Sequence, residues 1–392
     1  MTLNLKTYKN TTELGSLNGY PIYMQNIVDA GLRSKLNIFL QGDTGSGKTQ
    51  IVRDVMDYFG DKSLFILGRN DMDTRELFQQ VNPEFLRALK EGRNYKGSFK
   101  EITDRINYHL IAVDELPNCV PAVRAQLFNL FDGFIEVDGR PYPIGSGYCI
   151  GMATGNIGQQ FTESSNELGR ALRDRMHIIL DTDYFRPQPV DVHDMLSNNL
   201  NPRVSFSQSL EDKTEEIISR HKEIAKQEVP IEKLIVANYL VNGLDYIEGN
   251  NSKIALKSGW PSKIEKHEAG SDAALILPVS PRSAKSIITL SQALDEIIRE
   301  KGAKQSDYLD SMMFAFKFTG AHSGILNEAL VRQEYDEDHY KAMNAVIGMT
   351  KSQFESQKEN IAVGLEMASK GKKYKKILDK FAGRWQFMSG LL

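Results

Sequence analysis

Apolar residues along this chain of 392 residues follow two patterns, and the change from one to the other divides the sequence. Between residue 36 and about residue 185, short runs of consecutive apolar residues alternate with stretches whose apolar positions recur every three or four residues. The runs predict buried strands at residues 36–40, 63–67, 108–113, 148–153 and 176–180. Because helical stretches separate them, this part is predicted to fold as a parallel α/β sheet.

Beyond Pro187 and Pro189 the pattern becomes mostly helical, and these prolines mark a predicted domain edge. Helices are predicted at residues 211–227, 231–247, 283–300 and 305–318, with a helical, charge-rich tail from about residue 320. Ahead of the sheet, a helix is predicted at residues 21–32. The segment 249–280 is rich in Gly, Ser, Asn and Lys, which indicates a long loop or a partly ordered insertion.

Composition narrows the class of protein without naming a function. Hydrophobic residues make up 41% and charged residues 25%, and the formal net charge of −3 gives no general attraction to nucleic acid or to an anionic membrane. The two cysteines, Cys119 and Cys149, lack metal-ligand spacing and are expected to be buried. With no signal-peptide pattern and no apolar run near the ~20 residues that span a membrane, a cytoplasmic enzyme is expected.

The most specific motif lies between the first predicted strand and a helix predicted at residues 50–59. Its sequence, Gly42-Asp43-Thr44-Gly45-Ser46-Gly47-Lys48-Thr49, fits the phosphate-loop pattern G-x-x-x-x-G-K-[ST]. The glycines let backbone N–H groups turn towards phosphate oxygens at the positive end of a helix. The loop and the following Gln50 are therefore predicted to bind nucleotide, with Lys48 at the β- and γ-phosphates and Thr49 on Mg²⁺.

A second motif is the apolar run of residues 110–113 that ends in Asp114 and Glu115. Ligands bind at the carboxyl ends of parallel strands, so both acids are expected beside the phosphate loop. Asp114 would bind Mg²⁺, and Glu115 would accept a proton from the water that attacks the γ-phosphate, or orient that water. Because the chain has no Asn-Lys-x-Asp string, by which GTPases recognise guanine, ATP is the predicted nucleotide.

Asn156 and three arginines extend the candidate site. Asn156 follows the apolar run 150–155 and is expected either to hold the attacking water or to cap a turn. Arg170, Arg173 and Arg175 precede the last predicted strand, and an arginine supplied by a neighbouring subunit stabilises a transferring phosphoryl group. A solvated helical face is the alternative interpretation of Arg170 and Arg173.

The sequence Ser280-Pro281-Arg282 predicts the start of a helix, with serine as its cap and proline in its first position. Arg282 would then lie in the first turn, where a cation opposes the helix dipole. An anionic group is therefore expected to meet Arg282.

With these motifs in this order, residues 20 to 300 resemble the AAA+ ATPases, and within them the MoxR family of the helix-2-insert clade. Residues 134–144, with a tight turn predicted at Asp138-Gly139, look like that family's β-hairpin inserted into a core helix. Residues 172–176 are similar to its Leu-Asp-Arg-Phe segment. One departure is that residues 116–118 read Leu-Pro-Asn, where the family usually has Ile-Asn-Arg.

The resemblance implies roles for three residues. Asn156 is the sensor-1 residue, Arg175 the arginine finger and Arg282 the sensor-2 arginine. Arg173 is an additional basic residue beside the finger position, so the choice between Arg173 and Arg175 stays open. Catalytic roles are thus expected for Lys48, Glu115 and these three residues.

The predicted fold class is α/β, a P-loop NTPase three-layer αβα core with a parallel sheet, followed by an all-α lid domain and a helical C-terminal extension. The predicted domains are a leader at 1–35, the ATPase core at 36–185 with the hairpin near 134–144, the lid with its sensor-2 helix at 186–300, and the extension at 301–392. The segment 249–280 and the tail beyond 300 match no motif of the family.

The resemblance also implies a function. The expected enzyme is an ATP hydrolase with ATP and Mg²⁺ as cofactors, working as a homo-oligomeric ring, usually a hexamer. Its output is expected to be remodelling or activation of a client or a von Willebrand factor A partner, or metallocofactor insertion. A nucleic-acid motor of a restriction or defence system, and a nucleotide-state switch, are the alternatives.

Two weaker signals concern contacts with a client. Tyr95 and Phe99 are expected either to project into a central pore and grip a client chain or to pack as ordinary aromatics. The basic run at residues 370–376 is interpreted as a solvated face rather than a nucleic-acid contact, given the net charge of −3.

Overall fold

The computed structural model describes residues 12–69, 75–97, 99–137, 139–155, 175–184, 189–197, 212–244, 275–304, 306–371 and 375–392. The chain forms two compact units. The core unit contains Tyr23–Lys222, and the helical unit contains Glu13–Ile22 and Glu223–Leu392. Within the described residues, no helix is both long enough and apolar enough to cross a membrane.

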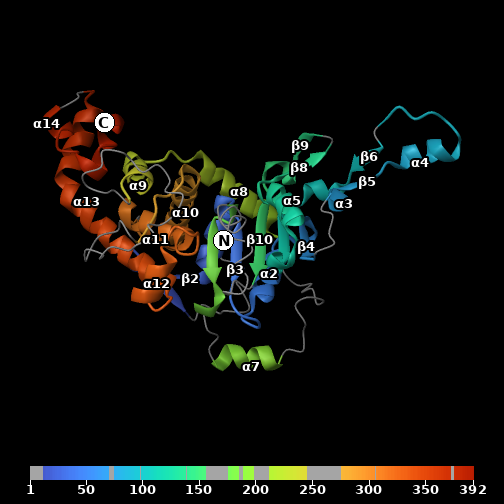
Figure 1. The fold of residues 1–392 in the computed structure, drawn as a ribbon, viewed down its shortest axis with the longest axis horizontal. Helices are drawn as coiled ribbons and strands as arrows, with labels where there is room; N and C mark the ends of the chain where they lie inside the picture. The colour runs from blue at the N-terminus through green and yellow to red at the C-terminus, as the bar shows by residue number, and fades with distance from the viewer. Residues whose placement is uncertain are drawn as a thin grey trace. The chain divides into compact units, whose positions relative to one another are not determined.

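A five-stranded parallel sheet forms the centre of the core unit, and Figure 1 labels its strands β3, β4 and β10. The order of the strands is β11-β3-β10-β7-β4. The strands are β3 (Ile38–Gln41), β4 (Ser63–Leu67), β7 (Leu110–Asp114), β10 (Ile150–Gly155) and β11 (Ile178–Asp181). All five predicted strands are therefore found, each within two residues of its predicted bounds. The continuous apolar runs have the expected cause, because every residue of β7 and β10 is buried.

The core unit also contains the helices α1 (Met24–Ser34), α2 (Lys48–Met56), α5 (Pro121–Phe131) and α7 (Pro189–Ser197), and α8 (Thr214–Lys226) begins in it. Of these, α2 and α5 pack against β10. The helix predicted at residues 21–32 begins later, since Tyr20–Tyr23 form a strand, β2, that pairs with β1 (Glu13–Leu17). Asn18 and Gly19 join these strands with φ of 49° and 74°, the conformation of a tight hairpin turn.

The core unit has an insertion between β4 and β7 that was not predicted from the sequence. It consists of β5 (Gln79–Val81), α4 (Pro83–Lys90) and β6 (Lys100–Ile102), with β5 and β6 antiparallel. We call residues 79–102 the arm; Figure 1 shows it projecting away from the sheet. The helical turns α3 (Arg75–Phe78) and η2 (Asp104–Asn107) stand on either side of it and pack together.

Strands β8 (Phe134–Val137) and β9 (Arg140–Pro143) pair as an antiparallel hairpin where one was expected. This hairpin follows α5 and reaches β10 through a single 3-10 turn, η4 (Gly145–Gly147). The prediction that this hairpin is inserted into a core helix is therefore wrong. Among the described residues, the arm rather than the β8–β9 hairpin has a helical turn on each side, α3 before it and η2 after it.

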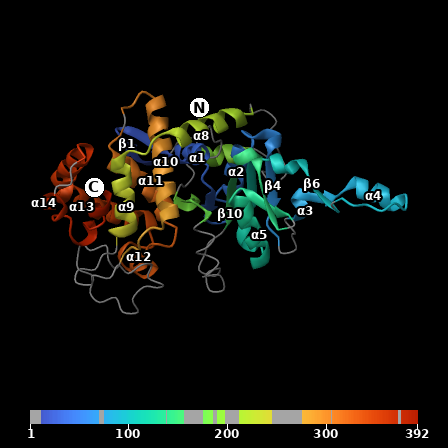
Figure 2. The same cartoon turned by 90° about the horizontal axis from the view of Figure 1, so that it is seen from above.

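The helical unit is built on α9, α10 and α11, which pack against one another (Figures 1 and 2). Its helices are α9 (Ile231–Asn242), α10 (Pro281–Glu300), α11 (Tyr308–Gly320), α12 (Glu328–Glu334), α13 (His339–Ser369), α14 (Lys375–Leu378) and α15 (Met388–Leu391). The apolar face predicted for α10 is its buried face, with Ile287, Leu290 and Leu294 fully buried. Helix α11 begins three residues later than predicted, because the Asp307 side chain accepts from the Leu309 N–H and caps it there.

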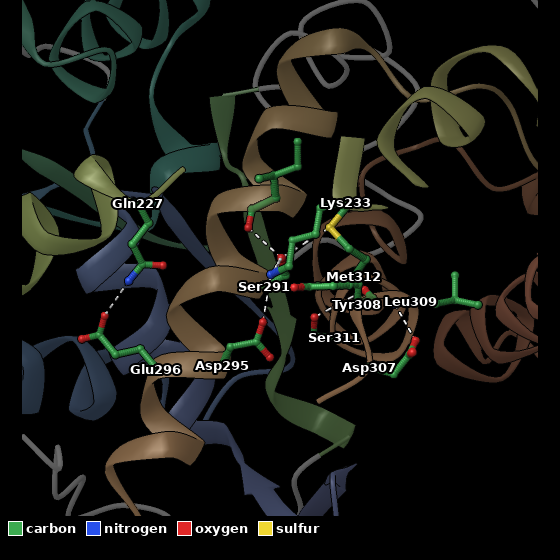
Figure 3. A network of polar contacts seen from close by, with 11 residues as sticks. Gln227, Lys233, Ser291, Asp295, Glu296, Asp307, Tyr308, Leu309, Ser311 and Met312 are labelled. Carbon is green, nitrogen blue, oxygen red and sulfur yellow. Dashed lines mark hydrogen bonds and ion pairs between the residues drawn. The ribbon is translucent and has the colours of Figure 1, made fainter. Parts of the chain in front are cut away.

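An ion pair lies inside this unit (Figure 3). The Lys233 ammonium of α9 donates to Asp295 Oδ2 and to Ser291 Oγ of α10, both at 2.8 Å. Both charged side chains are almost fully buried. The pair joins two helices that are neighbours in the fold and 62 residues apart in the sequence.

Candidate phosphate-binding site

The glycine-rich loop joins the end of β3 to the start of α2, as predicted for a phosphate loop. Gly42, Gly45 and Gly47 have φ of 148°, 86° and 84°, a region that side chains disfavour. Gly42 is also crowded, since a β-carbon there would lie 2.2 Å from Thr182 Oγ1, whereas Gly45 has open space around it. Gly42 is thus needed for close packing as well as for its backbone angle.

Lys48 lies in the first turn of α2 and turns its side chain back over the loop. Its Nζ donates to Gly42 O at 2.8 Å and to Asp43 O at 2.6 Å, with Ser46 Oγ at 3.3 Å. Burial lowers the pKa of Lys48, and the nearby carboxylates of Asp183, Asp43, Asp114 and Asp181 oppose that shift. The hydrogen-bond partners are uncharged oxygens, so the ammonium is held in place and is suited to receive an anion.

Asp114 lies at the carboxyl end of β7, where it faces the loop helix. Its side chain is buried and accepts from Thr49 Oγ1 at 3.1 and 3.2 Å and from Thr154 Oγ1 at 2.6 Å. The same Thr154 hydroxyl accepts the Glu115 N–H at 3.0 Å. Thr154 was not among the predicted site residues, although a polar residue near the end of the buried run 150–155 was the available signal.

The oxygen atoms of Thr49 and Asp114 fit a hard cation such as Mg²⁺. A buried carboxylate facing a hydroxyl is the type of donor set that Mg²⁺ uses together with substrate phosphates. The described residues contain no group of three or more His, Cys, Asp or Glu side chains that could hold a metal ion. A cation at this site would therefore take its other ligands from nucleotide and water.

Glu115 follows Asp114 in a left-handed conformation, with φ of 58° and ψ of 44°. Non-glycine residues rarely adopt this conformation, and such strain is frequent at functional sites. Its Oε2 accepts from Asn118 Nδ2 at 2.9 Å, which orients the carboxylate. Asn118 belongs to the Leu-Pro-Asn segment that departs from the family pattern, so this departure supplies a partner for Glu115.

Arg175 lies at the other end of the sheet from the loop. It precedes β11, whose Ile178 pairs with Ile38 at the start of β3, while the loop follows the end of β3. Arg175 Nε donates to Asp132 Oδ2 at 3.2 Å, and the guanidinium lies over the Phe128 ring. Within one chain, Arg175 is therefore not brought to the phosphate loop.

The other predicted residues divide into two groups. Asn156, Arg170 and Arg173 lie outside the described residues, as does Asp138 of the hairpin. Arg282 is exposed in the first turn of α10 in the helical unit, where the Ser280 side chain accepts the Ser283 N–H at 3.1 Å as predicted for a cap. The structure thus brings together the loop, Asp114 and Glu115.

Comparison with known proteins agrees with this geometry. Residues 37–176 match the AAA domain (dynein-related subfamily). The chain is similar to the crystal structure of a putative ATPase from Cytophaga hutchinsonii ATCC 33406, with 15% identity and a TM-score of 0.55 over 82% of this chain and 88% of that chain. No curated protein matches the chain.

The structural likeness, at 15% identity, concerns the fold alone. The domain match spans the phosphate loop, Asp114 and Glu115, which are the residues that the fold brings together. The core unit has the AAA+ fold, and nucleotide binding follows from its domain family. The match assigns an AAA domain to residues 37–176, and together with the site it supports ATP hydrolase activity.

Proposed function

We propose that this protein is a MoxR-like AAA+ ATPase that forms a ring, usually a hexamer, and uses ATP hydrolysis to remodel or activate a partner protein. One observation supports the proposed ring. Arg175 lies where the parallel strands begin, and the phosphate loop lies where they end. A finger at that place can reach a γ-phosphate only on another subunit.

The proposed reaction uses groups already in position. The loop amides and Lys48 bind the phosphates, and Glu115, oriented by Asn118, takes a proton from the attacking water. Mg²⁺ held by Thr49 and Asp114 would offset phosphate charge. Arg175 of a neighbouring subunit stabilises the charge of the transferring phosphoryl group, while Asn156 and Arg282 have their sensor roles.

The arm is the proposed contact with the client. Val81, Leu86, Leu89 and Phe99 are large apolar side chains exposed on it, at 40%, 44%, 65% and 53%. Tyr95 is half-buried, receives a hydrogen bond from Asn82 and packs edge-on against Phe85, so it holds the arm together. Phe99 also packs on Phe85 but stays half-exposed, which supports it rather than Tyr95 as a residue that contacts the client.

The ring is tested by mixing two inactive variants. Glu115→Gln removes the base, and Arg175→Ala removes the finger. In mixed rings, a site with an intact Glu115 can receive Arg175 from a Glu115→Gln neighbour, so mixing should restore part of the ATP turnover. Arg332→Ala, an exposed arginine of α12, is the control for general loss of charge.

If the mixture stays inactive, Arg175 does not act in trans and the ring loses its support. Binding of ATP by the Glu115→Gln variant tests the nucleotide site independently of the ring. For the arm, Leu86→Asp with Leu89→Asp should abolish capture of a client by Glu115→Gln rings and leave basal turnover intact. DNA-stimulated turnover with a steep salt dependence would instead favour the nucleic-acid motor.

A further inference from the structure

The turn that follows the last strand of the sheet lies against the outer side of the phosphate loop. Strand β11 ends at Asp181, and η6 (Thr182–Tyr184) follows directly. Asp181 pairs in register with Gln41, the residue immediately before the loop. The parallel pairing therefore carries Thr182 and Asp183 alongside the first half of the loop, residues 42–46.

Two side chains of this turn contact the loop. Thr182 Oγ1 donates to Gln41 O at 2.8 Å, and Ser46 Oγ lies 2.7 Å from the same hydroxyl. Asp183 Oδ2 accepts the backbone N–H of Asp43 at 2.7 Å. Thr182 is buried against Gly42, which has no room for a side chain.

These contacts differ from the loop's internal hydrogen bonds. Thr44 N–H donates to the Asp43 carboxylate at 2.7 Å, and the Ser46 hydroxyl donates to Asp43 O at 2.9 Å, so both bonds stay within the loop. The Thr182 hydrogen bond to Gln41 O and the Asp43 N–H bond to Asp183 instead connect the loop and the residue before it to the turn that follows β11. Such external contacts limit the conformations of a glycine-rich loop before a ligand arrives, which reduces the entropy lost on binding.

We propose that Thr182 and Asp183 are positioning residues that hold the first half of the phosphate loop in its nucleotide-binding conformation. The inference rests on the proposed nucleotide site and adds to it a turn that no motif contains. Asp183 has two opposed effects there. Its hydrogen bond to Asp43 favours the bound loop, while its negative charge near Lys48 competes with phosphate.

A pair of substitutions separates these effects. Asp183→Ala removes the acceptor and the charge, whereas Asp183→Asn keeps an acceptor oxygen and removes the charge. From the worth of one hydrogen bond, we expect Asp183→Ala to weaken ADP binding about two- to tenfold. Asp183→Asn should bind ADP at least as tightly as the wild type. Thr182→Val, which keeps the shape of the side chain, should also weaken binding.

The measurement is calorimetric titration of the full chain with ADP and Mg²⁺, together with steady-state ATP turnover. A positioning role raises KM and leaves kcat within about twofold, which general unfolding would not do. Asp104→Ala, an exposed aspartate of η2, is the matched control. Melting curves establish that each variant is folded.

ADP affinity of Asp183→Ala equal to that of Asp183→Asn would overturn the proposal. Both variants lack the charge and only Asn keeps the acceptor, so the hydrogen bond would then be irrelevant. Failure of the wild type to bind ADP would instead overturn the nucleotide site itself, and the positioning role with it.

Discussion

Two buried lysines, one in each unit, are held in contrasting ways. Lys233 of the helical unit is 1% exposed and bonds to the Asp295 carboxylate (Figure 3), while Lys48 of the core unit is 9% exposed and bonds to carbonyl and hydroxyl oxygens. Burial lowers the pKa of both. A lysine that only stabilises the fold has its counter-ion in contact, whereas the phosphate loop keeps its lysine available for a ligand's charge.

The largest expected effect comes from breaking the pair in the helical unit. Lys233→Met leaves the Asp295 carboxylate buried without its cation, which costs about 3–5 kcal/mol of unfolding free energy. The measurement is urea unfolding followed by tryptophan fluorescence. Both tryptophans of the chain, Trp260 and Trp385, lie in the segment 223–392, so the signal reports on that segment.

The control replaces both charges. Lys233→Met with Asp295→Leu fills the same space with apolar atoms, and such replacements of a buried pair are often neutral or stabilising. The double variant should therefore regain most of the loss. If it is as unstable as Lys233→Met alone, shape rather than charge decides stability there, and the contrast with Lys48 fails.

Removing Lys48 should have the opposite consequence. Lys48→Met is expected to lower ATP turnover by roughly 10²–10³, the usual effect of losing one donor to a developing charge. Its unfolding free energy should change by less than about 1 kcal/mol, because no counter-ion is left unpaired in direct contact. Turnover at saturating ATP measures the first effect, and urea unfolding measures the change in unfolding free energy. Unchanged turnover would refute the loop assignment.

Nucleotide should stabilise one unit selectively. At a concentration of 100 times its Kd, ADP adds about 2.7 kcal/mol to the state that binds it. We expect this gain in the wild type and in Lys233→Met but a much smaller gain in Lys48→Met. The gain in stability of the core unit is measured by how far ADP protects Cys119 and Cys149 from thiol labelling during denaturation. Equal gains in all three proteins would separate Lys48 from nucleotide binding.

The sequence predicted the sheet well for a physical reason. Strands buried on both faces are continuous apolar runs, and residues 110–113 form such a run. The arm was missed because its strands are short and partly exposed. Gln79 pairs with Ile102 and Gln80 with Glu101, so no alternation of apolar and polar residues marks the strands. The β1–β2 hairpin had a signal, Asn18-Gly19, that went unused.

The site was predictable where its residues are contiguous. The loop, Asp114 and Glu115 belong to short sequence motifs that can be recognised without the fold. Thr154 and Thr182 belong to no such motif. Thr154 reaches Asp114, and Thr182 reaches the loop, only because parallel strands bring their carboxyl ends to the same side of the sheet. The position of Arg175 at the opposite edge likewise depends on strand register, which no single segment encodes.

The smallest expected effect tests whether the two units unfold independently. Cys119 and Cys149 both lie in the core unit, and burial raises the pKa of Cys149 to about 12, so its thiol should not react at pH 8 in the native state. If the units are energetically separate, Lys233→Met should leave the rate of cysteine labelling within about twofold of the wild type. Labelling that accelerates in proportion to the lost stability would instead mean that the pair in the helical unit also stabilises the nucleotide site. The contrast between the two lysines would then be one of chemistry alone and not of separate folding units.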